Sequence, residues 1–254
     1  MIVKLAQLIV TRDIETNFHK IIHVLNSAKE QEWIIFPEGM LSGYYPEEKT
    51  FLEQLDFEKI QKYLDQIKSK VTEKKCLCIF GSAYRSDNKW YNSSIFLDET
   101  QMLIYHKNNL AMLDRSHFHQ GNSIETYKSR GVVFGIQMCR ELVFPEQWKL
   151  LKHQGAQIIF HINNSIKVSD EVRKHLLIAR AFENQYYICS VNNADKPQTM
   201  ASYVISPTGE VIYESTPQEE IENTVTLDLV QVDDTYLSQE RSDLVKLVLL
   251  EYKN

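Results

Sequence analysis

The chain is poor in the residues that characterise several common classes of protein. It has four cysteines in 254 residues, and their spacing is not paired, which argues against a disulfide scaffold and suits a reducing compartment. No apolar run approaches the roughly 20 residues that a membrane-spanning helix needs. The N-terminus, Met1-Ile2-Val3-Lys4, begins like a strand and lacks the basic-then-apolar order of an export signal. We therefore expect a cytoplasmic protein without a membrane partner.

An excess of positive charge is also missing. The formal net charge is -6 and the isoelectric point is about 5.8, whereas nucleic-acid binding depends mainly on clustered Lys and Arg. The short basic clusters 68–70 and 74–75 lie beside acidic residues, as on a solvated helix face. The eight histidines are scattered, and the closest approach to a metal-ligand spacing is His117-Phe118-His119. We expect neither a nucleic-acid partner nor a metal.

Strand-like apolar runs alternate with amphipathic helices along the whole chain. Ile14, Phe18, Ile21 and Leu25 recur at three- and four-residue spacing and predict a helix over 13–29. Further helices are expected at 57–71, 145–154 and 170–184, and strands at 2–10, 33–36, 77–80, 94–97, 102–105, 132–138, 157–162, 186–191, 202–205, 211–213 and 224–227. Because no repeat or composition break interrupts this order, we predict one α/β domain over 1–254. Runs buried on both faces suggest two packed sheets flanked by helices.

A cysteine closes one of these strands. Cys139 follows the apolar run 132–138 and precedes a helix start at Pro145, so its thiol lies where a strand turns toward a helix. The thiolate is the nucleophilic form, and with a free pKa of about 8.5 it needs a nearby base or cation. Glu38 and Lys107 also follow strand-like segments. They predict a Glu-Lys-Cys centre, in which Glu38 moves the proton and Lys107 stabilises developing negative charge.

Each of these residues alone also fits an ordinary structural role. A buried cysteine is most often a small hydrophobe, and Cys76, Cys78 and Cys189 are interpreted in that way. Lys107 alone would be a solvated charge at a strand end, and Glu38 alone could cap a helix. Only the combination indicates chemistry.

The three segments resemble the signature blocks of the nitrilase superfamily, the carbon-nitrogen hydrolases. The resemblance covers nearly the whole chain and includes the opening strand 1–10, the segment 36–44 around Glu38, 105–107 with Lys107, the block at Cys139, and the non-catalytic segments 179–185 and 206–210. It implies a four-layer α-β-β-α sandwich and chemistry without a metal or an organic cofactor. It also implies that Cys139 attacks an amide, carbamoyl or nitrile carbon, with Glu38 as general base and Lys107 and the backbone N–H of Arg140 stabilising the intermediate.

One position departs from the family pattern. Members usually carry a second glutamate in the segment that here reads Asp114-Arg115-Ser116-His117-Phe118, so that the carboxylate of Asp114 is one methylene shorter. The resemblance implies that this carboxylate orients Lys107 and contacts the substrate or the attacking water.

The substrate is less well defined by the sequence. Loops after the three strands are expected to form the pocket, with Tyr44, Tyr45, His117, Phe118, Arg140, Glu141, Asn163 and Asn164 as candidate lining residues. Arg140 and the two asparagines could bind a carboxylate or an amide. The leading hypothesis is hydrolysis of a small amide or N-carbamoyl compound with release of ammonia. The alternatives are nitrile hydrolysis, acyl transfer, and a catalytically idle relative that acts as a binding or scaffold module.

The resemblance also implies a homodimer. The C-terminal tail from about residue 239 is rich in apolar residues, among them Leu244, Val245 and Leu247. We expect this tail to pack on a neighbouring subunit or on its own core.

Overall fold

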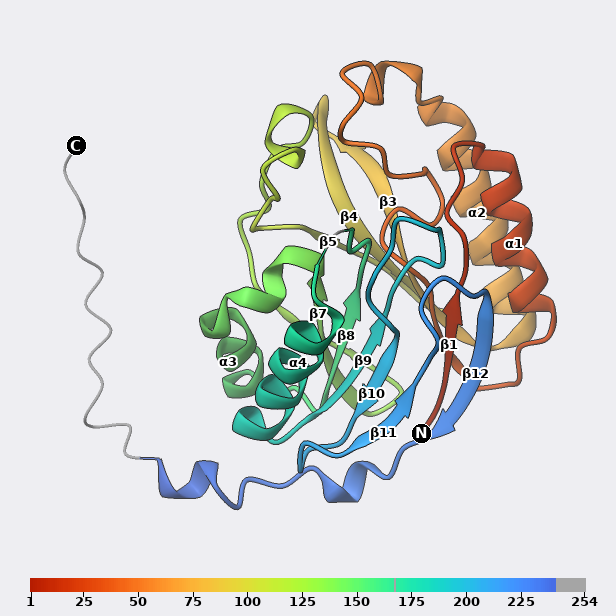
Figure 1. Cartoon of the computed structure of the whole chain (residues 1–254). Coiled ribbons are helices and arrows are strands. Elements are labelled where there is room, and N and C mark those ends of the chain that lie inside the picture. The colour runs from red at the N-terminus through yellow and green to blue at the C-terminus, as the bar shows by residue number, and fades with distance from the viewer. Residues whose placement is uncertain (167, 241–254) are drawn as a thin grey trace.

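Two six-stranded sheets form the middle of the protein (Figure 1), as seen in a computed structural model that describes residues 1–166 and 168–240. The first sheet has the order β12-β1-β2-β3-β4-β5, with β1 at Ile2–Gln7, β2 at Trp33–Ile35, β3 at Leu77–Ser86, β4 at Lys89–Leu97, β5 at Met102–His106 and β12 at Ile221–Thr226. The second has the order β11-β10-β9-β8-β7-β6, with β6 at Thr126–Ser129, β7 at Val132–Met138, β8 at Ile158–Ile162, β9 at Tyr187–Val191, β10 at Tyr203–Ile205 and β11 at Val211–Glu214. The central strands β1, β2 and β3 are parallel, as are β7, β8 and β9.

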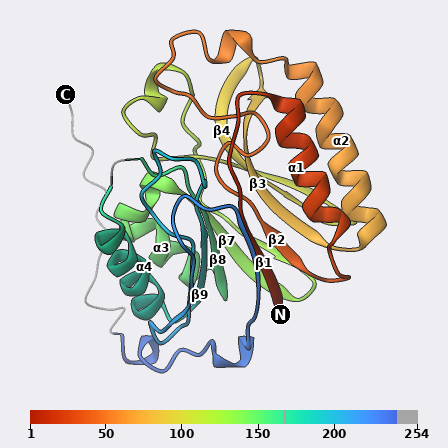
Figure 2. The same ribbon diagram turned by 45° about the vertical axis from the view of Figure 1, so that its right-hand side comes forward.

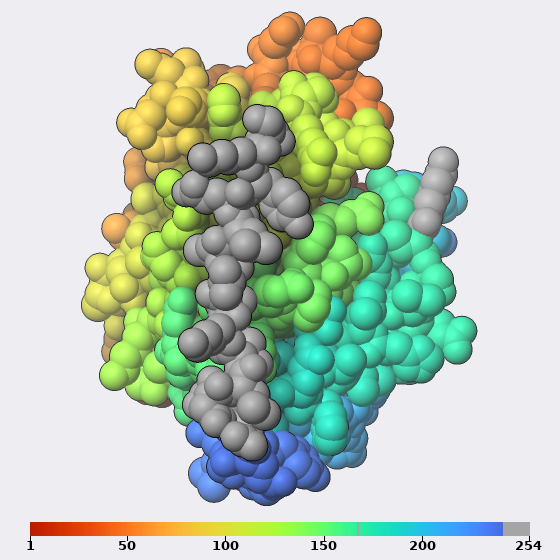
Figure 3. Space-filling view, turned by 90° about the vertical axis from the view of Figure 1, so that its left-hand side faces the viewer, coloured from red at the N-terminus to blue at the C-terminus, as the bar shows by residue number. Residues whose placement is uncertain are grey.

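Helices cover the outer face of each sheet. The pair α1 (Ile14–Asn26) and α2 (Phe57–Lys74) lies on the first sheet, and the pair α3 (Pro145–His153) and α4 (Asp170–Asn184) lies on the second (Figures 1 and 2). Figure 3 shows α3 and α4, in green and teal, on one face of the molecule, with the end of the described chain below them in blue. The predicted four-layer α-β-β-α sandwich is confirmed.

Three buried apolar clusters hold the layers together. The first joins α1 and α2 to their sheet, the second lies between the sheets, and the third joins the second sheet to α3 and α4. Between the sheets the Trp33 ring stacks on the Phe160 ring with centroids 5.3 Å apart, and the Phe134 ring meets Trp33 edge-on. These ring contacts hold the strands β2, β7 and β8 of the two sheets against one another.

Local chemistry explains where the helices begin. The Asp13 carboxylate accepts hydrogen bonds from the backbone N–H groups of Glu15 and Thr16, which caps α1. Asp56 and Ser169 cap α2 and α4 in the same way. Among the described residues, no helix combines the length and apolarity that crossing a bilayer would need.

The structure differs from the predicted elements at several points. The strands β3 and β4 extend well beyond 77–80 and 94–97 and form a long hairpin, because Asp87 and Asn88 adopt the positive φ angles of a two-residue turn. The strand β6 was not predicted, because its residues Thr126–Ser129 are mostly polar. The first strand ends at Gln7 and not at residue 10, and β12 starts at Ile221 and not at 224. Most of the predicted tail, residues 241–254, lies outside the described residues.

Candidate active site

The three residues predicted for the reaction all lie at the ends of strands. Glu38 follows β2, Lys107 comes directly after β5, and Cys139 comes directly after β7 at the start of the 3-10 helix η3 (Cys139–Val143). The loop that carries Glu38 passes very close to β3, because a Cβ atom added to Gly81 would lie 2.6 Å from the Glu38 Cα and 2.2 Å from the Gly39 nitrogen. Glycine at position 81 therefore allows Glu38 to reach the site.

Lys107 is the centre of a buried ion cluster. Its Nζ lies 2.9 Å from Glu38 Oε1 and 2.9 Å from Asp114 Oδ2, and all three side chains are 0% exposed. The Asn92 amide donates a 2.8 Å hydrogen bond to Glu38 Oε1, and the Tyr44 hydroxyl donates to Asp114 Oδ1. Burial opposes the charge on Lys107, but the two carboxylates outweigh it and raise its pKa above the ordinary lysine value. Lys107 is therefore an ammonium ion in this site.

Glu38 has one carboxylate oxygen available for proton transfer. While Oε1 is bound to Lys107 and Asn92, Oε2 is buried and has no hydrogen-bond partner among the described residues. Burial raises the pKa of Glu38, and the nearby charge of Asp114 raises it further against the opposing effect of Lys107. A raised pKa brings a carboxylate closer to the working range of a general base near neutral pH.

Cys139 adopts an unusual backbone conformation. Its φ of 40° lies in the left-handed region that non-glycine residues seldom occupy. The half-buried thiol lies 3.8 Å from the backbone oxygen of Asn164 and 3.8 Å from Ser165 Oγ. Burial and the charge of Glu38 raise the thiol pKa, whereas Lys107 lowers it. The thiol is therefore protonated at rest and needs a base before it can act as a nucleophile.

The buried ring of His161 holds the backbone of Cys139 in place. Its Nε2 lies 3.2 Å from the Cys139 carbonyl oxygen, and its Nδ1 lies 3.1 Å from Ser190 Oγ and 3.0 Å from the Asn163 amide nitrogen. A carbonyl can only accept, so Nε2 carries the proton and Nδ1 accepts. Burial lowers the pKa of His161 to about 3, which keeps the ring neutral. The sequence pattern predicted His161 only as part of a strand, although a histidine within the apolar run Ile158–Ile162 indicates a specific contact.

Glu141 was predicted as a pocket residue, and its contacts correct this prediction. Its Oε1 accepts hydrogen bonds from the Tyr105 hydroxyl and from the backbone N–H groups of Asn108 and Asn109, and its Oε2 accepts one from the Met138 N–H. Both oxygens of this buried side chain are thus occupied by protein donors. Glu141 ties the loop after Lys107 to the turn at Cys139, which is a structural role.

Five of the other predicted lining residues divide into two groups. Tyr44, Tyr45 and Asn164 line a cavity of about 60 Å³ beside the ion cluster. His117 and Phe118 instead support the loop after Glu38, since His117 Nε2 lies 2.9 Å from the Pro46 carbonyl oxygen and Phe118 packs in a small separate apolar cluster.

The remaining two candidates are Asn163 and Arg140. Asn163 is buried, and its backbone oxygen accepts a 3.3 Å hydrogen bond from the Glu38 N–H. Arg140 is exposed. Within residues 1–166 and 168–240, no three His, Cys, Asp or Glu side chains are grouped as a metal site would require.

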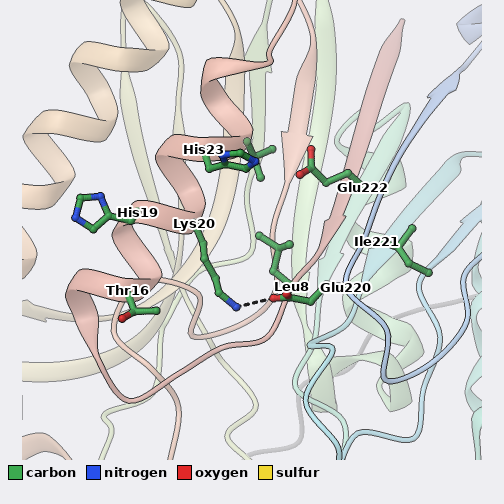
Figure 4. A pocket seen from close by; sticks show the side chains of 9 residues that line it. Leu8, Thr16, His19, Lys20, His23, Glu220, Ile221 and Glu222 are labelled. Atoms are coloured by element: carbon green, nitrogen blue, oxygen red, sulfur yellow. Dashed lines mark hydrogen bonds and ion pairs between the residues drawn. The ribbon is translucent and has the colours of Figure 1, made fainter.

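A separate surface groove lies away from this site. It is a groove of about 620 Å³ between α1 and β12, in which Lys20 and Glu220 form a 2.5 Å ion pair beside His19, His23 and Glu222 (Figure 4). It contains none of the candidate active-site residues.

Fold and site together define an α/β protein with a thiol, two carboxylates and an ammonium ion gathered at the ends of its strands, a set of groups suited to nucleophilic catalysis. Comparison with known families leads to a definite assignment. The family model of the carbon-nitrogen hydrolases matches residues 2–236. The chain belongs to this family and is a carbon-nitrogen hydrolase.

Individual relatives agree with this assignment. The chain is 28% identical to an (R)-stereoselective amidase of a Pseudomonas species, over 86% of this chain and 82% of the relative. It is 31% identical to a hydrolase encoded in the agr operon of Staphylococcus lugdunensis, over 80% of this chain and 91% of the relative. Among solved structures, an amidase of the nitrilase superfamily from Nesterenkonia superimposes with a TM-score of 0.82 at 20% identity, over 96% of this chain and 95% of that chain.

Proposed function

We propose that the protein hydrolyses a small amide or N-carbamoyl compound through a thioester on Cys139. Glu38 takes the thiol proton as the sulfur attacks the carbonyl carbon, which turns the carbonyl oxygen into an oxyanion. Lys107 and the backbone N–H of Arg140 stabilise that charge. Glu38 returns the proton to the leaving nitrogen, the C–N bond breaks, and ammonia departs. Glu38 then activates a water molecule, which cleaves the thioester and restores the thiol.

The observation that carries this proposal is the buried cluster in which Lys107 bridges Glu38 and Asp114. We assign Asp114 the role of the second carboxylate, since its 2.9 Å contact holds the ammonium ion in place. The free Oε2 of Glu38 supplies the proton acceptor that the protonated thiol needs. The Nesterenkonia amidase offers a chemical precedent, because its variant carries the acetamide moiety of fluoroacetamide covalently at the active-site cysteine.

The cluster also argues against an idle scaffold protein. Replacing buried ion pairs by well-packed apolar residues is often neutral or stabilising, so a protein selected only for binding has little physical reason to keep one. Nitrile hydrolysis and acyl transfer would use the same thiol. The amidase named above among the sequence relatives favours amides over nitriles.

The test measures ammonia release by the wild type and by Cys139→Ala on a panel of small carboxamides, N-carbamoyl amines and nitriles. We expect release from carboxamides or N-carbamoyl amines by the wild type alone, with an acyl adduct on Cys139 detected by intact mass. Cys76→Ala serves as the matched control, because Cys76 is a buried free thiol outside the site. Turnover of nitriles only, or equal release by Cys139→Ala, would refute the proposal.

We further propose a cytoplasmic homodimer with the chain beyond residue 239 at its interface. Light scattering of the wild type and of a chain truncated at Asp243 tests this: we expect a dimer that the truncation weakens. An unchanged mass and an unchanged stability after truncation would contradict the interface role. Fractionation of the source cells tests the location.

A further inference from the structure

A small cavity shares two of its walls with the candidate active site. Tyr44 lines the cavity, and its hydroxyl donates to Asp114 of the ion cluster. Asn164 lines it as well, and its backbone oxygen lies 3.8 Å from the Cys139 sulfur. The cavity measures about 60 Å³, which suits a group of a few heavy atoms. The cavity therefore borders two residues that contact the ion cluster and the Cys139 sulfur.

The cavity offers hydrogen-bond acceptors. Gln198 is 1% exposed, and its Nε2 donates to Asn164 Oδ1. Its Oε1 is buried and has no partner among the residues that the structure describes. A buried acceptor without a donor costs free energy, and a ligand that brings an N–H group recovers it. The side chain of Gln198 therefore fits a donor in the cavity.

The cavity also carries negative charge. The exposed Glu47 and the half-buried Asp195 contribute to its lining, and neither forms an ion pair with another described residue. Both carboxylates act on the neighbouring Tyr45 hydroxyl: burial raises its pKa, and the charges of Asp195 and Glu47 raise it further. The Arg12 guanidinium lies 4.0 Å from the Tyr45 ring centre and pairs with Glu48, and its charge lowers the pKa of Tyr45, which offsets part of the effect of the two carboxylates. The two charged side chains of the lining itself, Glu47 and Asp195, are both negative.

We propose that this cavity binds an ammonium group of the substrate, so that the physiological substrate is a small amino amide. An ammonium ion donates to the free oxygen of Gln198 and is attracted by Glu47 and Asp195. The amide carbonyl of the same molecule then lies at Cys139, separated from the ammonium group by a short carbon chain. This inference rests on the proposed amide hydrolysis and adds the charge of the substrate to it.

The experiment compares three small amides that differ in charge, of which the first two have the same shape. In 3-aminopropanamide an ammonium group replaces the terminal methyl group of butanamide, and succinamate offers a carboxylate in the same place. Ammonia release is measured for the wild type, for Glu47→Gln/Asp195→Asn, and for Glu58→Gln/Asp65→Asn. The last variant removes two equivalent charges from the exposed face of α2 and serves as the control.

We expect the wild type to prefer 3-aminopropanamide over butanamide in kcat/KM by about 10- to 100-fold, the range for hydrogen bonds to a charged group. The Glu47→Gln/Asp195→Asn variant loses about tenfold of that preference, mainly through KM, while the control variant keeps it. A wild type that prefers butanamide or succinamate would overturn the proposal. So would a preference that stays the same in the cavity variant.

A binding measurement separates failure of the cavity assignment from failure of the proposed hydrolysis. If the wild type releases ammonia from none of the three amides, binding to Cys139→Ala is measured by calorimetry with 3-aminopropanamide and butanamide. Tighter binding of the ammonium compound, lost when Glu47 and Asp195 are also replaced, supports the cavity assignment without the reaction. Equal binding of both compounds refutes it.

Discussion

Removing the ammonium ion of Lys107 tests the buried cluster by its effect on stability. In Lys107→Met the carboxylates of Glu38 and Asp114 remain in a fully buried site without their shared cation. Two carboxylates in one such site cannot both stay ionised, so one of them must take up a proton. From an ordinary pKa of about 4.3, holding that proton at pH 7.5 costs about 4 kcal/mol, which agrees with the ~3–5 kcal/mol for breaking a buried ion pair.

The loss must depend on pH in a defined direction. Burial already raises the pKa of Glu38 in the folded protein, and removing Lys107 removes the charge that opposes this shift. A folded carboxyl group with a raised pKa binds a proton that the unfolded chain has released, so stability falls as the pH rises above the unfolded pKa. The destabilisation relative to the wild type is therefore largest at pH 7.5 and smaller by about 2–3 kcal/mol at pH 5.5.

Urea unfolding at the two pH values measures this difference. Lys59→Met is the matched control, because Lys59 forms a partly exposed ion pair with Glu15 on the surface. We expect this control to lose less than about 1 kcal/mol at either pH. A loss below about 1 kcal/mol for Lys107→Met, or an equal loss at both pH values, would show that the cluster does not carry the charges assigned to it.

Three further predictions concern Cys139 and the residues around it. Because burial and Glu38 raise the Cys139 pKa, alkylation by iodoacetamide should still accelerate above pH 8.5, and a plateau below pH 8 would contradict a protonated thiol. Gly81→Ala would place a Cβ 2.2 Å from the Gly39 nitrogen, so we expect a loss of about 2 kcal/mol or more in urea unfolding together with lower activity; an unchanged midpoint would refute the close packing. Glu141→Gln keeps the shape of the side chain but puts an NH2 group against backbone N–H donors. An unsatisfied buried group costs ~1–3 kcal/mol, so we expect a lower thermal unfolding midpoint. A midpoint within about 1 °C of the wild type would contradict the anchoring role of Glu141.

The sequence predicts those parts of the site that follow directly from strand ends. Glu38, Lys107 and Cys139 each come after an apolar run, and this local pattern places them at the edge of a sheet without knowledge of the packing. Asp114 follows only from the family resemblance, because it lies in the short 3-10 helix η2 (Asp114–Ser116), which is too short to show a periodic pattern.

The parts that the sequence could not predict depend on contacts between distant segments. Glu141 lies two residues after Cys139, and this proximity suggested a pocket residue. Its carboxylate instead accepts hydrogen bonds from backbone N–H groups of the loop after β5. Gln198 and Asp195 reach the cavity from a loop more than 50 residues beyond Cys139, and nothing in their own segment distinguishes them. The strand β6 was missed because its pairing with β7, and not an apolar pattern, makes it a strand.

The positive φ of Cys139 has a consequence for any attempt to engineer this protein. A non-glycine residue in that conformation costs the fold of the order of 1–3 kcal/mol, and glycine at the same place would relieve most of it. A search for thermostable variants that scores folding alone would therefore favour Cys139→Gly, which removes the nucleophile that we propose. Under the proposed mechanism stability and activity are opposed at this backbone position, so position 139 has to be held fixed while the rest of the chain is optimised.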